Sequence, residues 1–177
     1  MNPFTSVKLL SLCTLTMLIT LPFSSLDSNA MALFTKKVPI YLSPQISGVI
    51  KNQGEPLANV ELERSIYLNF TGDYYIDKTR SDAQGRFSFA QKTLELKKPS
   101  DMVTVVKRQE LYVKYENKPV SIWFMNIHTL NPVNKISQKL QGLDCDLAHS
   151  EQQFDFKDSK YPASTFSVMT RCRWHDK

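Results

Sequence analysis

Apolar and polar residues alternate with the two-residue period of a β-strand over most of the chain after Val38. The stretch "VELERSIYL" at residues 60–68 shows this most clearly, because Val60 and Leu62 alternate with Glu61 and Glu63. Further runs of the same kind occupy residues 46–50, 74–81, 110–116, 118–127 and 165–174, and "FDF" at 154–156 is a shorter candidate. The pattern predicts an all-β sandwich of about seven strands.

A turn in the stretch "SDAQGRFSFA" at residues 81–90 predicts a first hairpin. Asp82 can accept hydrogen bonds from the backbone two residues on, and Gly85 tolerates a positive φ without a Cβ clash. Phe87 and Phe89 lie two residues apart, which is the period of a sheet. We therefore interpret the phenylalanines as core residues and Asp82 and Gly85 as a structural turn with no catalytic role.

A second hairpin is expected where residues 110–116 and 118–127 flank a short polar turn. Strict alternation places Ile122 on the inner face and both Tyr112 and Trp123 on the opposite face. Exposed aromatic side chains there would form a binding patch, whereas a sheet covered on both faces would bury them, and we favour the second interpretation. The candidate binding aromatics of the chain are Tyr74, Tyr75, Tyr112 and Trp123.

One short helix is predicted at residues 132–141. Asn131 is suited to cap its start, Pro132 to occupy its first position and Gly142 to end it. Its apolar residues recur at helical spacing and share one face. We expect this helix to pack on the sandwich and to lead the chain to Cys145.

The first thirty residues differ from the rest of the chain. A short start with one basic residue precedes a mostly apolar run at 9–23, and small residues follow it up to Ala30. This is the three-part layout of a secretory signal peptide, and the apolar run is too short to span a membrane comfortably. We expect cleavage after Ala30 and export of residues 31–177 as a single domain. The alternative is that translation begins at Met31.

Removal of the leader leaves two cysteines, Cys145 and Cys172. An even pair in an exported protein predicts a disulfide, with Cα atoms roughly 4.4 to 6.8 Å apart and a contribution of roughly 3 kcal/mol to stability. A thiol nucleophile would instead need a nearby base and a reducing compartment. His128, His149 and His175 are scattered singly and show no zinc-ligand spacing, so we expect no metal.

The formal net charge of +5 favours acidic partners only modestly, because the basic pairs lie far apart with acidic residues between them. No nucleic-acid motif, phosphate-binding loop or hydrolase signature is found. We therefore expect no nucleic-acid partner, no cofactor, no catalytic residues and contact with a membrane only during export.

Residues 46–89 resemble the carboxypeptidase-regulatory-like, or transthyretin-like, β-sandwich modules. The resemblance rests on "SGV" at 47–49, "GEPLANV" at 54–60 and "TRSDAQGRFSF" at 79–89. It implies a Greek-key sandwich and carries no chemistry, because such modules are mostly non-catalytic. The related hydroxyisourate hydrolases have a histidine-rich site and a Tyr-Arg-Gly-Ser terminus, and this chain lacks both.

The whole mature chain also resembles a bacterial family of small standalone proteins of unknown function. The shared features are Leu33-Phe34 near the start, "LDCDL" at 143–147 and "CRW" at 172–174. This resemblance implies a bacterial source and, together with the leader, the periplasm.

Three classes of function remain open. The first is a non-catalytic periplasmic protein-interaction module, one concrete version being an immunity protein against a toxic effector delivered between bacteria. The alternative is a module that binds envelope carbohydrate or another small ligand through its aromatic side chains. The third is an enzyme of unrecognised type. Fold alone does not decide among them.

Overall fold

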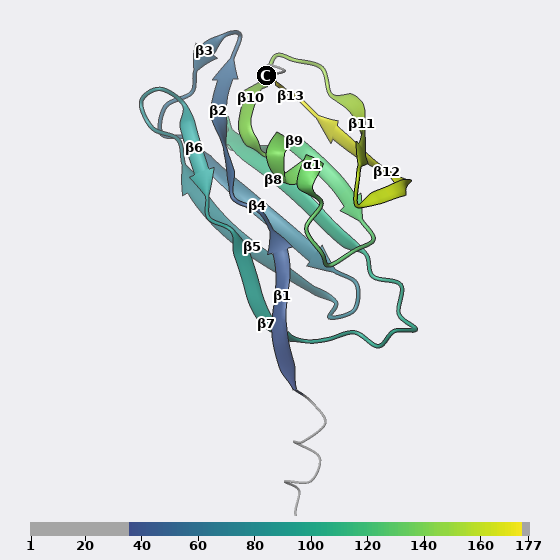
Figure 1. The fold of residues 1–177 in the computed structure, drawn as a ribbon. Helices are drawn as coiled ribbons and strands as arrows, with labels where there is room; N and C mark the ends of the chain where they lie inside the picture. The colour runs from purple at the N-terminus through teal and green to yellow at the C-terminus, as the bar shows by residue number, and fades with distance from the viewer. Residues whose placement is uncertain (1–35, 175–177) are drawn as a thin grey trace, which may run out of the picture. The chain divides into compact units, whose positions relative to one another are not determined.

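The computed structural model describes residues 36–174 and shows a predominantly β protein with a single short helix in that range (Figure 1). The predicted sandwich class is therefore confirmed, although the described residues form thirteen strands instead of about seven. The elements in chain order are β1 (Lys37–Ser43), β2 (Ile46–Asn52), β3 (Glu55–Pro56), β4 (Glu61–Leu68), β5 (Asp73–Arg80), β6 (Arg86–Phe89), β7 (Lys92–Lys97), β8 (Lys107–Tyr115), β9 (Lys118–Ile127), α1 (Asn134–Lys139), β10 (Gln141–Asp146), β11 (Gln152–Asp158), β12 (Tyr161–Thr170) and β13 (Cys172–Arg173). The expected signal peptide lies outside the described residues.

Two sheets form the layers of the sandwich. The larger has the order β11-β12-β9-β8-β4-β5, and the smaller has the order β13-β10-β2-β3 with β6 also paired to β2. The core lies between them and takes side chains from both, including Ile46 and Phe87 from the smaller sheet and Leu62, Leu111 and Val168 from the larger. Figure 1 shows α1 and β10 on the same side of the larger sheet.

A third sheet, made of β1 and β7, continues the pairing of β2 with β6 along the molecule. Ser43 pairs with Lys92 at the end of one sheet, and Ile46 pairs with Phe89 at the start of the other. Both strand pairs are thus interrupted at the same level, between residues 43 and 46 and between 89 and 92. A second apolar cluster, Ile40, Leu42, Ile66 and Leu68, packs this extension against the larger sheet.

The buried guanidinium of Arg64 fills this interruption. It projects inward from β4, and its Nη1 donates hydrogen bonds to the carbonyl oxygens of Pro44 at 3.4 Å and Ala90 at 2.9 Å. These carbonyls belong to the two broken strands, where no ladder partner is available to them. Because a buried polar group without a hydrogen bond is costly, Arg64 stabilises the break in both strands at once.

Asp77 supplies the counter-charge for Arg64. It lies directly opposite Arg64 in the β4–β5 ladder and accepts a hydrogen bond from Arg64 Nε at 2.8 Å. The same carboxylate also pairs with Lys92 at the start of β7. The network therefore ties β4 and β5 to the β1–β7 extension through one carboxylate.

We expect Asp77→Ala to lower the free energy of unfolding by about 3 kcal/mol, because it leaves Arg64 buried without its counter-charge. Glu63→Ala is the matched control, since Glu63 is the neighbouring β4 carboxylate and pairs with Lys78 on the outer side of the sheet. Its loss should change stability by less than about 1 kcal/mol. Urea unfolding of both variants measures the difference, and equal losses would contradict the role assigned to Asp77.

Lys107 is buried on the inner face of β8, with its Nζ 5.3 Å from the centre of the Tyr41 ring. Burial lowers the pKa of Lys107 from 10.5 to about 8, because the ammonium loses its hydration. The unfolded chain therefore binds more protons than the native protein between about pH 8 and 10.5, so this group makes stability rise with pH across that window.

We expect Lys107→Met to raise the free energy of unfolding at pH 7 by about 1 to 3 kcal/mol, because an apolar side chain of similar length replaces a buried cation. The advantage of the variant should shrink as the pH rises from 8 to 10.5, since the native lysine then becomes neutral. Urea unfolding of both proteins at pH 7 and pH 10.5 tests this. An advantage that does not change with pH would show that packing, and not charge, separates them.

Cys145 on β10 and Cys172 on β13 lie directly opposite each other and form a disulfide with an S–S distance of 1.97 Å. Their Cα atoms are 3.8 Å apart, so the expected range of 4.4 to 6.8 Å was too long. Directly paired residues of antiparallel strands can approach more closely than the cysteines of most disulfides. A disulfide of this kind indicates an oxidising environment.

The turn after β5 connects the two layers, so the expected hairpin at residues 81–90 is wrong. β5 pairs with β4 in the larger sheet, whereas β6 pairs with β2 in the smaller one. Asp82 Oδ1 accepts hydrogen bonds from the backbone N–H groups of Gln84 and Arg86, both at 2.8 Å. Gly85 has a φ of 72°, and a Cβ there would lie 2.5 Å from the carbonyl oxygen of Ile50. Alternation identifies a core-facing strand but not the sheet to which it belongs.

We expect Gly85→Ala to be more destabilising than Gly72→Ala by about 1 kcal/mol or more. Gly72 has nearly the same φ, 74°, but a Cβ there would meet nothing within 4 Å. The control therefore carries the backbone strain of a positive φ alone, and the difference reports the contact with β2. Thermal unfolding of the two variants makes the comparison, and equal losses would show that the turn can move away from β2.

The helix lies where the sequence predicts it, although α1 begins at Asn134 and its N-cap position is Val133. The expected cap residue, Asn131, is not used. Asp158 from β11 instead accepts a hydrogen bond from the backbone N–H of Lys135 at 2.9 Å, and such backbone hydrogen bonds lower the pKa of Asp158. Among residues 36–174, no helix has the length and apolar character that crossing a membrane requires.

Candidate interaction surface

The larger sheet is covered on one side by the smaller sheet, the β1–β7 pair and α1, while its other side carries half-buried and exposed side chains (Figure 1). We call the part of this second side that β4, β5, β8 and β9 form the open face. Its outward residues are Glu61, Glu63, Ser65 and Tyr67 on β4, Tyr74, Ile76, Lys78 and Arg80 on β5, Arg108, Glu110, Tyr112 and Lys114 on β8, and Pro119, Ser121, Phe124 and Asn126 on β9.

Apolar side chains gather at the β5 side of the open face. Tyr74 is 59% exposed and Ile76 is 52% exposed. The ring of Tyr74 lies against that of Tyr67 on β4, with ring centres 4.9 Å apart. The guanidinium of Arg108 on β8 lies over the Tyr67 ring, 5.9 Å from the ring centre. Tyr67, Tyr74 and Ile76 therefore present aromatic and aliphatic surface to solvent.

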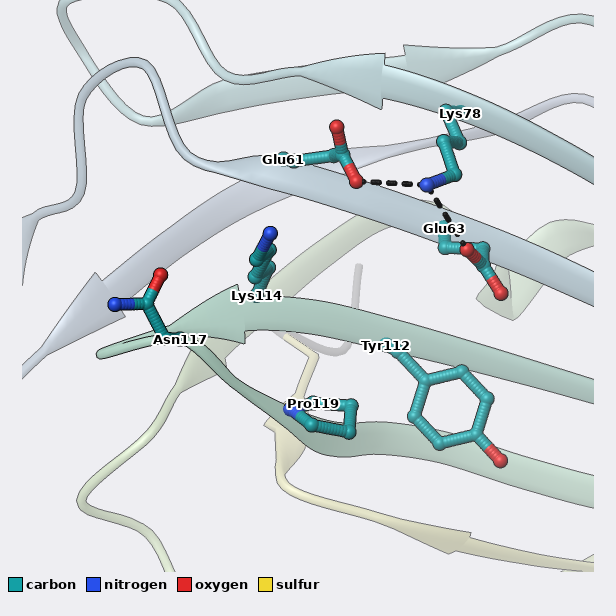
Figure 2. A pocket seen from close by; sticks show the side chains of 7 residues that line it. All are labelled: Glu61, Glu63, Lys78, Tyr112, Lys114, Asn117 and Pro119. Carbon is teal, nitrogen blue, oxygen red and sulfur yellow. Dashed lines mark hydrogen bonds and ion pairs between the residues drawn. The ribbon is translucent and has the colours of Figure 1, made fainter.

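A row of charges lies next to the aromatic residues. Lys78 bridges two carboxylates of β4, with its Nζ 2.9 Å from Glu61 and 3.5 Å from Glu63 (Figure 2). The hydrogen bond and the charge of Lys78 lower the pKa of Glu61, and Glu61 in turn raises the pKa of Lys78. Arg80 approaches Glu61 at 3.8 Å. Exposed ion pairs of this kind add little to folding stability, so the row serves mainly to order the surface.

A hollow of about 440 Å³ lies beside this row. Figure 2 shows Tyr112 from β8 and Pro119 from β9 along one side and the two glutamates with Lys78 along the other. Its remaining lining residues, Lys114 and Asn117, lie at the β8–β9 hairpin. Glu116 and Asn117 have φ values of 49° and 61°, which is the geometry of a two-residue turn in a tight hairpin.

The four predicted binding aromatics do not share one surface. Tyr74 and Tyr112 lie on the open face as outward residues of β5 and β8. Tyr75 lies on the inner face and packs against the second apolar cluster, with its hydroxyl 3.4 Å from Thr71 Oγ1. Its assignment to a binding patch is therefore wrong, because neighbouring residues of a strand point to opposite faces.

Trp123 is buried, as the favoured interpretation expects, since it is 0% exposed and packs in the core, but the face that strict alternation assigns to it is wrong. A β-bulge in β9 is the reason. Ser121 pairs with Tyr112 and Trp123 pairs with Leu111, so Ile122 is an extra residue between them. One inserted residue reverses the alternation beyond it, which turns Trp123 inward and Phe124 outward.

The residues of the open face that the sequence interpretation did not name include Tyr67, Ile76, Arg108 and Phe124. The alternation of residues 60–68 already places Tyr67 outward, so a signal for it existed. The pairing of β4 with β8, which brings Arg108 beside Tyr67, joins strands distant in the sequence and has no local signal.

The described residues include no group of three or more His, Cys, Asp or Glu side chains able to hold a metal ion. His149 lies with its Nδ1 3.2 Å from the carbonyl oxygen of Arg171, as part of the contact between the β10–β11 loop and the C-terminal strand. The open face itself presents aromatic, charged and amide side chains, including Tyr112, Lys78 and Asn117.

The described residues define a predominantly β protein with sandwich-like sheets and a single short helix. The chain belongs to the DUF6795 family, whose model is described as a domain of unknown function and matches residues 46–150. The matched region runs from β2 to the end of β10 and includes all four strands of the open face. No curated protein shows significant similarity to the chain.

Proposed function

We propose that the protein is an exported, non-catalytic module that binds another protein through the open face. The observation that supports this most directly is the exposure of Tyr74 and Ile76 within a surface of interspersed charges. Tyrosine and arginine are enriched where proteins meet. A folded domain has no internal reason to leave this row uncovered.

The size of the open face favours a protein over a small molecule. Four strands about 4.8 Å apart and about eight residues long span roughly 500 Å² before side-chain relief is included. A stable protein interface buries about 800 Å² on each partner, so the face and its rim are of the appropriate size. Charges of both signs, held by the Lys78 bridge, favour one correctly oriented partner over others.

The setting that we propose is the bacterial periplasm, reached through the predicted leader at residues 1–30. The disulfide supports an oxidising compartment. The proposal includes the carboxypeptidase-regulatory-like, or transthyretin-like, architecture, in which the sandwich serves as a scaffold. In its most specific form the partner is a toxic effector delivered between bacteria, and the protein is the immunity protein that covers it.

Site-specific photo-crosslinking in living cells tests the proposal. A benzophenone side chain at position 76 on β5 should give a discrete adduct with a partner. The same probe at Ser88, an exposed outward residue of β6 in the other layer, should not. Once mass spectrometry identifies the partner, Tyr74→Ala and Tyr112→Ala should each weaken its binding at least tenfold, with Ser88→Ala as the neutral control.

The immunity proposal makes a further prediction about the same partner. Co-production with a toxin encoded beside this gene should restore growth, and a Tyr74→Ala/Ile76→Ser variant that folds normally should fail to restore it. Adducts at both probe positions, or full protection by the variant, would contradict binding through the open face.

The hollow beside Tyr112 favours a second candidate, an envelope carbohydrate. A ring surface next to carboxylates and an amide can stack a sugar and bind its hydroxyl groups, and about 440 Å³ is within the range of small-ligand sites. Binding to a glycan array that is lost in Tyr112→Ala and retained in Tyr74→Ala would favour the carbohydrate over the protein partner.

A further inference from the structure

Four lysines gather at the end of the molecule where β1 begins and β7 ends, and we call this region the basic end. Lys37 and Lys97 are directly opposite each other in the β1–β7 ladder, and Lys36 and Lys98 flank them. Like charges placed opposite each other in a sheet are destabilising. Among residues 36–174, the ion pair recorded for these lysines joins Lys98 to Asp101 at 3.8 Å, with both side chains exposed. Among the described residues, one carboxylate pairs with the four lysines, so the basic end keeps an excess of positive charge.

An apolar tip lies beside the lysines, in the loop from β7 to β8. Met102 is 94% exposed and Val103 is 41% exposed, the first being the most exposed large apolar residue of the described chain. The backbone N–H of Val103 donates a hydrogen bond to the carbonyl oxygen of Ser100 at 3.0 Å. Met102 is thus the third residue of a tight turn and projects from its corner.

Asn69, in the turn after β4, holds the base of this loop. Its side-chain amide donates to the carbonyl oxygen of Thr104 at 2.8 Å, and its Oδ1 accepts from the N–H of Val106 at 2.8 Å. Its own backbone N–H donates to the carbonyl oxygen of Val106 at 3.1 Å. Three hydrogen bonds therefore fix the direction in which the loop presents Met102, so the exposed tip is a built feature of the fold.

We propose that the basic end binds the surface of an anionic lipid bilayer, with Met102 and Val103 inserted between the lipids and the lysines against their headgroups. Lysines near an anionic surface each add to membrane affinity, and an apolar side chain beside them can enter the acyl boundary. Two apolar side chains on a protruding turn are too few for a stable protein interface, which buries about 800 Å² on each partner. A bilayer requires no shape-complementary surface.

This membrane contact is separate from the open face and goes beyond the proposed function. The sequence predicts contact with a membrane only during export, whereas the basic end would keep the folded protein at the membrane surface afterwards. The basic end borders the open face at the β4–β5 turn, because Asn69, Phe70 and Thr71 of that turn line the same hollow as Lys97 and Lys98. A partner bound on the open face would then be met at the membrane.

Co-sedimentation of the purified protein with vesicles tests the proposal without any protein partner. Vesicles of phosphatidylglycerol and phosphatidylethanolamine should bind it, and phosphatidylcholine vesicles should not. Lys97→Ser/Lys98→Ser should weaken binding about 25-fold, at roughly fivefold for each lysine. Lys118→Ser/Lys135→Ser removes the same charge from exposed positions away from the basic end and should have less than about a twofold effect.

The apolar tip has its own test. Met102→Ser should weaken vesicle binding about tenfold while leaving the charge unchanged. In a Met102→Trp variant, brominated lipids should quench the added indole fluorescence, and in a Gln84→Trp variant, altered in the exposed turn after β5, they should not. Circular dichroism and thermal unfolding establish that each variant is folded.

Four outcomes would overturn the proposal. Equal losses in the two lysine pairs would indicate general attraction of a cationic protein to anionic vesicles. Competition by millimolar inorganic phosphate would indicate an anion site in the hollow beside Lys97 and Lys98 instead of a bilayer surface. Unchanged binding by Met102→Ser, or equal quenching at both indole positions, would show that the tip does not enter the lipid.

Discussion

The ion pair between buried Arg64 and half-buried Asp77 is the interaction on which the architecture depends. The guanidinium satisfies two carbonyls where β1–β2 and β6–β7 are both interrupted, and the carboxylate opposite it neutralises the charge. A buried guanidinium without a counter-charge would cost folding free energy. The Arg64–Asp77 pair therefore stabilises both the interruption in the smaller layer and the register of β4 with β5. The outward neighbours of these two residues belong to the open face, so the buried network determines how that surface is presented.

The inner and outer faces of the larger sheet have different structural roles. The inner face packs against the smaller sheet, α1 and the disulfide-linked C-terminal strand, and the outer face keeps aromatic and charged side chains in solvent. The bulge at Ile122 places the two aromatic residues of β9 on different faces, because it turns Trp123 into the core and Phe124 outward. A rigid scaffold with one uncovered face agrees with a protein that acts by recognition.

The local patterns of the sequence predicted the class of fold, the β8–β9 hairpin and the position of α1, since each depends on residues close in the chain. The assignment of β5 and β6 to different layers was not predictable, because Phe87 and Phe89 alternate in the same way in either sheet. Trp123 was assigned to the wrong face because a bulge leaves no mark within the continuous apolar run at residues 122–125. The role of Arg64 depends on two chain breaks far from it in sequence. The open face was therefore predictable only in part, through Tyr74 and Tyr112.

Whether the open face is covered in the cell is the most direct test of the central claim. An Ile76→Cys variant can be labelled with a membrane-impermeant maleimide under non-reducing conditions, first in cells with a permeabilised outer membrane and then after purification. Protection in cells and rapid labelling after purification are expected, while Ser88→Cys on the other layer should be labelled in both states. Equal labelling of position 76 in both states would show that no partner occupies the open face.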